Sequence, residues 1–157
     1  MNEKLFFSSR VCKVITFINV NFANPTSLQE ICLAVNLSEQ HAERIFKQEV
    51  GIPIKKFQIL KRLYEAACTL RSDPKTSENY VLSYCGFDDV SNFIRQFKNH
   101  FGCAPIKFRN CNRDPGSCGL WKQSYFHLLV RKRRLREALG TDISHPCMLS
   151  RIKKANK

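Results

Sequence analysis

The side chains best suited to contact another molecule occur as two similar sets of cations. Arg44 and Lys47 are followed by Gly51, and the same spacing returns in Arg95 and Lys98 at an offset of 51 residues. A guanidinium group can bond guanine O6 and N7 together, or bridge two phosphate oxygens. Lysine more often neutralises a phosphate, which positions a protein without specifying a base. A solvated helix face is the alternative, and recurrence of the pattern disfavours it.

Polar residues beside these cations could read base edges. Gln40 can bond adenine, while Ser91 and Asn92 offer short donors and acceptors. Glu43 can accept from cytosine N4, or simply tune repulsion near phosphates. The candidate contact residues are therefore Ser38, Gln40, His41, Glu43, Arg44, Lys47, Val90, Ser91, Asn92, Arg95 and Lys98.

Composition limits the kind of partner. The 157 residues carry a formal net charge of +13, and 43% of them are hydrophobic, which is enough for a packed core. A strongly basic globular chain favours nucleic acid or an anionic membrane surface as its partner, with solubility alone as the alternative.

Eight cysteines could suggest disulfides, but their placement favours free thiols. Cys32, Cys68 and Cys85 fall on apolar faces of predicted helices, where a thiol behaves as a small hydrophobe. The N-terminal apolar stretch, residues 5–7, is too short for a secretory signal, and no apolar run reaches transmembrane length. We expect a cytoplasmic protein in a reducing compartment, with no membrane partner.

Neither a metal site nor a catalytic site is predicted. Cys111, Cys118, His145 and Cys147 could ligate zinc, but no Cys-x-x-Cys pair accompanies them. The chain contains no glycine-rich phosphate loop and no Gly-x-Ser-x-Gly motif. We therefore expect no cofactor and no enzymatic activity.

Apolar periodicity and turn residues predict seven helices. The first three span residues 11–22, 28–35 and 38–50, with a Ser27–Glu30 capping box before the second. Short helices joined by a tight turn at Asn36 form a helix-turn-helix. A longer helix over residues 54–71 is apolar on two sides, so we expect it to be a spine buried between two units.

The second unit repeats the first. Helices are predicted at 77–85, 89–101 and 105–109, with Asp88 or Asp89 capping the middle one. Residues 111–157 differ, because they hold 11 Lys and Arg against 3 Asp and Glu. We predict a double helix-turn-helix domain over 1–110 and a basic, partly helical extension over 111–157.

Residues 11–109 resemble the DNA-binding domain of the AraC/XylS family of bacterial transcription regulators. The segments carrying the resemblance are residues 86–98, with Gly-Phe-Asp-Asp-Val-Ser-Asn-Phe, the closing residues 101–109, and Arg62 to Ala66 of the spine. The resemblance implies an all-α fold of seven helices with a long linker helix. Because few residues precede the first helix, the chain resembles the short, stand-alone members of the MarA and SoxS type.

The resemblance also implies a function. It indicates a regulator of transcription, an activator or a repressor, that binds double-stranded DNA as a monomer, with two recognition helices in successive major grooves. RNA polymerase is a further candidate partner, and the location would be the nucleoid. The chain departs from the family pattern mainly in the second unit, at Glu78, Leu82, Ile94 and Gln96.

Two alternatives stay open, the first of which is consistent with these departures. The chain could keep the fold but act as a protein-interaction or non-specific nucleic-acid-binding protein. A membrane-surface role could use the extension, where Leu120, Trp121, Phe126, Leu128 and Leu129 adjoin a cationic run.

Overall fold

The computed structural model describes residues 7–73 and 75–110, which form helices and connecting turns with no strand among them. The prediction of an all-α fold is confirmed. The predicted basic, partly helical extension over 111–157 lies outside the described residues, and so do the candidate zinc ligands in it. The helices are α1 (Ser9–Val20), α2 (Leu28–Ala34), α3 (Glu39–Val50), α4 (Ile54–Ser72), α5 (Glu78–Tyr84), α6 (Val90–Phe101) and α7 (Pro105–Asn110).

Side-chain caps fix where most of these helices begin. The hydroxyl oxygens of Ser27, Ser38 and Ser77 each accept from a backbone N–H in the first turn of α2, α3 and α5. The capping box predicted at Ser27 is present, since the Glu30 carboxylate accepts from the Ser27 backbone N–H at 2.6 Å. Asp89, not Asp88, caps α6. Each cap satisfies a helix N–H group that has no partner within the helix.

The first helix ends earlier than its apolar pattern indicates. The chain leaves α1 after Val20, and the Asn21 side-chain amide donates to the Phe17 carbonyl at 2.9 Å. Phe22 therefore lies in the α1–α2 loop. Its ring meets the edge of Tyr84 in α5, with centroids 5.9 Å apart. Its apolar character serves contact between the two units and does not extend the helix.

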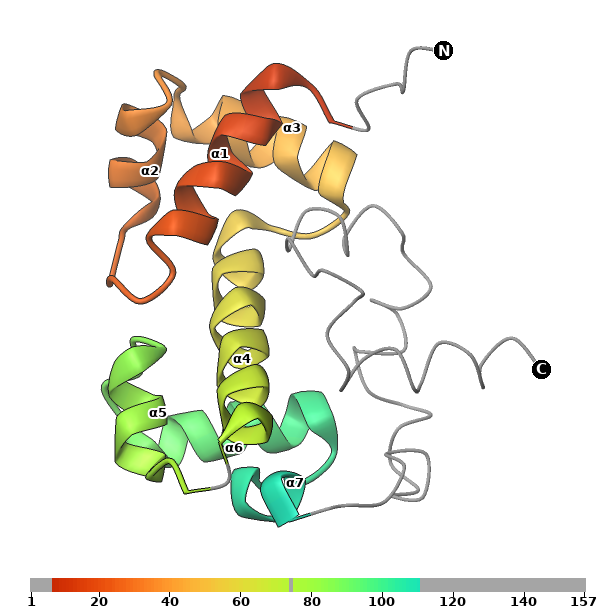
Figure 1. The fold of residues 1–157 in the computed structure, drawn as a ribbon. Helices are drawn as coiled ribbons and strands as arrows, with labels where there is room; N and C mark the ends of the chain where they lie inside the picture. Colours follow the sequence, from red (N-terminus) through yellow and green to blue (C-terminus); the bar gives the residue numbers. More distant parts are fainter. Residues whose placement is uncertain (1–6, 74, 111–157) are drawn as a thin grey trace, which may run out of the picture.

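Helix α4 is shared by the two units (Figure 1). Its N-terminal end contacts α3, and it also contacts α5 and α7. In the first unit, α1–α3, helix α1 packs on α2 and α3. In the second unit, α5–α7, the contact of α4 with α5 repeats that of α1 with α2, and the contact of α6 with α7 repeats that of α3 with α4. The predicted spine is confirmed, with buried residues Ile54, Phe57, Leu60, Lys61, Leu63, Ala66, Ala67 and Leu70.

Not every apolar residue of α4 is buried, although the sequence predicts a helix that is buried on two sides. Tyr64 and Cys68 are only half-buried. Lys61 is buried instead, and its ammonium pairs with Glu65 at 2.6 Å and lies 5.8 Å from the centre of the Phe22 ring. The long apolar stem of lysine can cover core surface while its charge is paired at the edge.

The described cysteines are free thiols, as expected from their apolar surroundings. Cys32 and Cys85 are buried, and burial raises the pKa of the Cys85 thiol to about 12. A thiol with so high a pKa stays protonated and unreactive at neutral pH. None of the described helices combines the length and hydropathy that a membrane span needs.

Candidate nucleic-acid interface

The two predicted recognition helices, α3 and α6, lie near opposite ends of α4 (Figure 1). In this view α3 passes behind α1 and α6 passes behind α4, so both lie on the far side. Their inward residues are equivalent: Ala42, Phe46 and Val50 in α3 are buried, as are Phe93, Phe97 and Phe101 in α6. The remaining faces of both helices carry the candidate contact residues.

Four candidate residues of the first unit, Ser38, Gln40, Arg44 and Lys47, are exposed. The Ser38 hydroxyl oxygen is engaged as the cap of α3, where it accepts from the His41 N–H at 3.4 Å. The first motif therefore presents one amide and two cations along the exposed side of α3.

His41 joins two arginines, one of which the sequence did not single out. Its Nε2 lies 3.2 Å from Arg10 Nη1, and its Nδ1 lies 3.2 Å from Arg44 Nη2. A neutral imidazole has only one acceptor nitrogen, so only one guanidinium can donate to it at a time. Arg10, in the first turn of α1, therefore adds a cation beside α3. No sequence pattern indicates Arg10, because it lies outside the repeated segment.

Glu43 has a structural partner. Its carboxylate accepts from the backbone N–H of Ile54, the first residue of α4, at 3.3 Å. Pro53, at the N-cap position of α4, makes no side-chain cap bond, so Glu43 supplies one from α3. A carboxylate at a helix N-terminus also interacts favourably with the helix dipole. One of its two carboxylate oxygens therefore links α3 to the spine.

The second unit presents a different surface. Ser91, Arg95 and Lys98 are exposed on α6, but Asn92 is half-buried. The Asn92 side-chain oxygen accepts from Arg95 Nη2 at 3.0 Å and from Gln96 Nε2 at 2.9 Å. The side chains of Val90 and Ile94 are also exposed, although they are apolar.

The turn of each motif contains one residue with left-handed backbone geometry. Asn36 has a φ of 55° in the first turn, and Gly86 has a φ of 72° in the second. Asparagine and glycine are the residues that adopt this region most readily. A Cβ on Gly86 would lie 2.1 Å from the Ala23 carbonyl oxygen, so the second turn fits closely against the α1–α2 loop.

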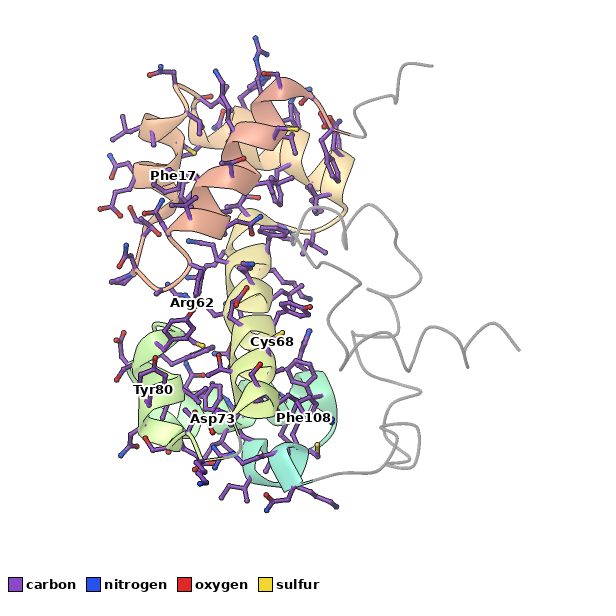
Figure 2. All side chains as sticks on the ribbon, in the orientation of Figure 1. Phe17, Arg62, Cys68, Asp73, Tyr80 and Phe108 are labelled. Atoms are coloured by element: carbon purple, nitrogen blue, oxygen red, sulfur yellow. The ribbon has the colours of Figure 1, made fainter. Side chains whose placement is uncertain are left out.

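Arg62 on α4 joins the two units at the same place (Figure 2). Its guanidinium donates to the carbonyls of Phe22 at 2.7 Å and Asn24 at 2.8 Å in the first unit. It also donates to the Gly86 carbonyl of the second unit at 3.0 Å. These three hydrogen bonds and the close approach of Gly86 to Ala23 fix how the two motifs sit relative to one another.

Comparison with known proteins agrees with this geometry. A protein family described as a helix-turn-helix domain matches residues 31–110, just over half of the chain. The chain belongs to the AraC/XylS family. The transcriptional activator AarP of Providencia stuartii is 29% identical over 104 residues, which cover 66% of this chain and 76% of AarP.

Other relatives show the same extent of similarity. The multiple antibiotic resistance protein MarA of Escherichia coli is 27% identical over 99 residues, 63% of this chain and 77% of MarA. The putative regulator YkgA of Escherichia coli is 28% identical over 98 residues, but these cover only 41% of YkgA. The chain thus matches most of the shorter relatives and less than half of this longer one.

Solved structures support the fold. The C-terminal domain of AraT, a response regulator from Geobacillus stearothermophilus, superposes with a TM-score of 0.64 over 69% of this chain and 89% of that domain, at 24% identity. The DNA-binding domain of the transcription factor AdpA, solved with a target DNA, superposes with a TM-score of 0.61 over 65% of this chain and 91% of that domain, at 19% identity.

Proposed function

We propose that this chain regulates transcription by binding a specific double-stranded DNA sequence, with α3 and α6 entering successive major grooves. The observation that carries the proposal is the pairing of two recognition helices on one chain through α4, Arg62 and Gly86. A helix of 19 residues is roughly 28 Å long, which is close to the roughly 34 Å between successive turns of one groove.

The candidate residues take different roles in this proposal. Arg44 and Arg95 approach bases or phosphates, and Gln40 and Ser91 contact base edges. Lys47 and Lys98 neutralise phosphates, and Arg10 does so as an addition from α1. Ser38, His41, Glu43 and Asn92 support these residues through the hydrogen bonds described above.

The related proteins lend this proposal further support. AarP is described as a transcriptional activator, and the AdpA domain was solved with its target DNA. By analogy we propose that the chain acts as an activator in the bacterial nucleoid and contacts RNA polymerase once bound. Because one chain holds both helices, a monomer suffices for binding.

Selection of bound sites from random duplexes, with the purified full chain, tests the proposal. We expect one asymmetric consensus with two segments about one helical turn apart. Log affinity should fall with log salt concentration, with a slope of about −0.9 for each phosphate neutralised. A palindrome bound only by dimers would contradict the monomer. Salt-sensitive binding without sequence preference would favour a non-specific nucleic-acid-binding protein, and a flat salt response would exclude DNA.

A further inference from the structure

Helix α6 exposes a pair of apolar side chains where α3 carries acids. Val90 is 48% exposed and Ile94 is 36% exposed, and the two lie one helical turn apart. At the offset of 51 residues their counterparts in α3 are Glu39 and Glu43. Helix α6 contains neither Asp nor Glu. The second recognition helix is thus apolar and cationic where the first is acidic and cationic.

The polar groups beside this pair are partly engaged within α6 itself. The Asn92 oxygen already accepts from Arg95 and Gln96, so reading a base with that oxygen would require these bonds to break. Val90 and Ile94, by contrast, face solvent on the same side as the exposed Ser91, Arg95 and Lys98. Their apolar area would be removed from water by any duplex that the flanking cations hold against α6.

The major groove offers one apolar group to such a pair. Among the base-pair edges, only the C5 methyl group of thymine is apolar, while the others present hydrogen-bond donors and acceptors. An apolar side chain pressed on a polar edge would desolvate that edge without replacing its hydrogen bonds. A·T pairs are therefore favoured under Val90 and Ile94, and G·C pairs are disfavoured.

We propose that Val90 and Ile94 determine specificity in the second motif by contacting thymine methyl groups. This inference rests on the proposed function. It assigns to α6 a half-site with thymines at the positions below the apolar pair. The half-site of α3 is read by polar groups, with Gln40 and Arg44 as the readers.

Deoxyuridine isolates this contact, because it differs from thymidine only by the missing methyl group and keeps the same hydrogen-bonding edge. Each thymine of a duplex selected by the full chain is replaced singly by deoxyuridine, and the dissociation constant is measured. We expect binding about fourfold weaker for each methyl group contacted by α6, and unchanged binding at the other thymines.

Protein variants then assign the lost methyl contact to these two side chains. In Ile94→Ala and Val90→Ala the difference between thymidine and deoxyuridine should shrink toward onefold at the affected position. Because both residues are exposed, the melting temperatures should change little. Ile106→Ala, which truncates a comparably exposed isoleucine on α7, should keep the full wild-type difference.

Two results would overturn the inference, and they differ in meaning. In the first, the chain binds duplexes in a salt-sensitive and sequence-specific way, but neither Ile94→Ala nor Val90→Ala removes a deoxyuridine effect. This result would refute the methyl contact and leave the proposed function intact. Absence of sequence-specific, salt-sensitive binding to duplexes would refute the proposed function and the methyl contact together.

Discussion

The two helix-turn-helix units of this chain agree on their inward face and differ on their outward face. Phe46 of α3 and Phe97 of α6 are equivalent and fully buried, as are Val50 and Phe101 apart from slight exposure. Glu43 and Ile94 are also equivalent, but one links α3 to the spine and the other faces solvent. Packing constrains the buried positions alone, so one fold can carry two surfaces that contact DNA differently.

The turns of the two units also differ. Asn36 and Gly86 are 50 residues apart, whereas Glu39 and Val90 at the helix starts are 51 apart. The second turn is therefore one residue longer, and its glycine approaches the backbone of Ala23. The second turn thus serves both as a connection within its motif and as a contact surface for the first unit.

Substitution of the two turn residues should give the largest difference between the units. Gly86→Ala should lower the free energy of unfolding by about 3–4 kcal/mol, because the left-handed backbone strain adds to overlap with the Ala23 carbonyl. Asn36→Ala should cost about 1 kcal/mol, since it carries only the backbone term. Chemical denaturation of both variants measures the two losses in free energy of unfolding. Equal losses would mean that the backbone at Ala23 moves to accommodate the added methyl group at no cost in free energy.

Arg62 allows the coupling between the units to be broken. Arg62→Ala removes three hydrogen bonds and should cost about 2–3 kcal/mol of stability. It should also broaden the spacing between the two segments in selected DNA sites, because the motifs are no longer held at one separation. Arg62→Lys should behave similarly, since one ammonium cannot reach three carbonyls in a planar fork. Unchanged spacing in both variants would show that Gly86 and α4 suffice.

The two arginines test whether both motifs read bases. Arg44→Ala should cost about 1–3 kcal/mol of binding free energy and relax preference at one base pair. Arg95→Ala should weaken binding with a smaller change in preference, because the apolar residues beside it are proposed to carry the specificity of α6. Binding of each variant to a panel of single-base site variants measures both quantities. Equal loss of preference would show that α6 also relies on its arginine.

A third comparison concerns pH. His100 in α6 is buried, whereas its α3 counterpart Glu49 is half-buried and its carboxylate accepts from the Ser8 N–H at 2.7 Å. Burial, aided by the positive charge of Lys56, lowers the pKa of His100 to about 4. Below about pH 6.5 the unfolded chain therefore binds more protons than the folded chain. The contribution of His100 to the free energy of unfolding is at its full value above that pH and is lost as the pH falls toward 4.

Because of His100, the free energy of unfolding should be about 1 kcal/mol lower at pH 5.5 than at pH 7.5. Hydrogen bonds lower the pKa values of the Glu30 and Asp73 carboxyl groups. The stability that these two groups contribute is therefore lost only at a pH below the range compared, so they do not account for the change between pH 7.5 and pH 5.5. Denaturation of the wild type and of His100→Gln at both pH values isolates the histidine. A pH dependence that persists unchanged in the variant would assign it to other groups.

Residues that obey local rules could be predicted from the sequence. The Ser27 capping box, the Gly51 stop and the phenylalanines of α6 follow from helix chemistry and period alone. Contacts made by long side chains across the fold could not be predicted. The bonds of Glu43 to Ile54, of Arg62 to three carbonyls and of Arg10 to His41 join residues whose proximity only the assembled helices determine. Phe22 shows that a local rule can also mislead, because it continues the apolar period of α1 although it lies beyond the end of that helix.

The smallest expected effect concerns the division of the chain at residue 110. All seven described helices lie before residue 111, and the shared helix α4 contacts α3 of the first unit and α5 and α7 of the second. A chain truncated after residue 113 should therefore melt cooperatively, which calorimetry can check. Deleting residues 114–157 removes 10 Lys and Arg against 3 Asp and Glu, so non-specific affinity should drop and the salt slope should become shallower. The ranking of preferred sequences should stay the same, because phosphate contacts position without specifying. An insoluble or non-cooperatively melting truncation would place the extension against the helical core and make the division wrong.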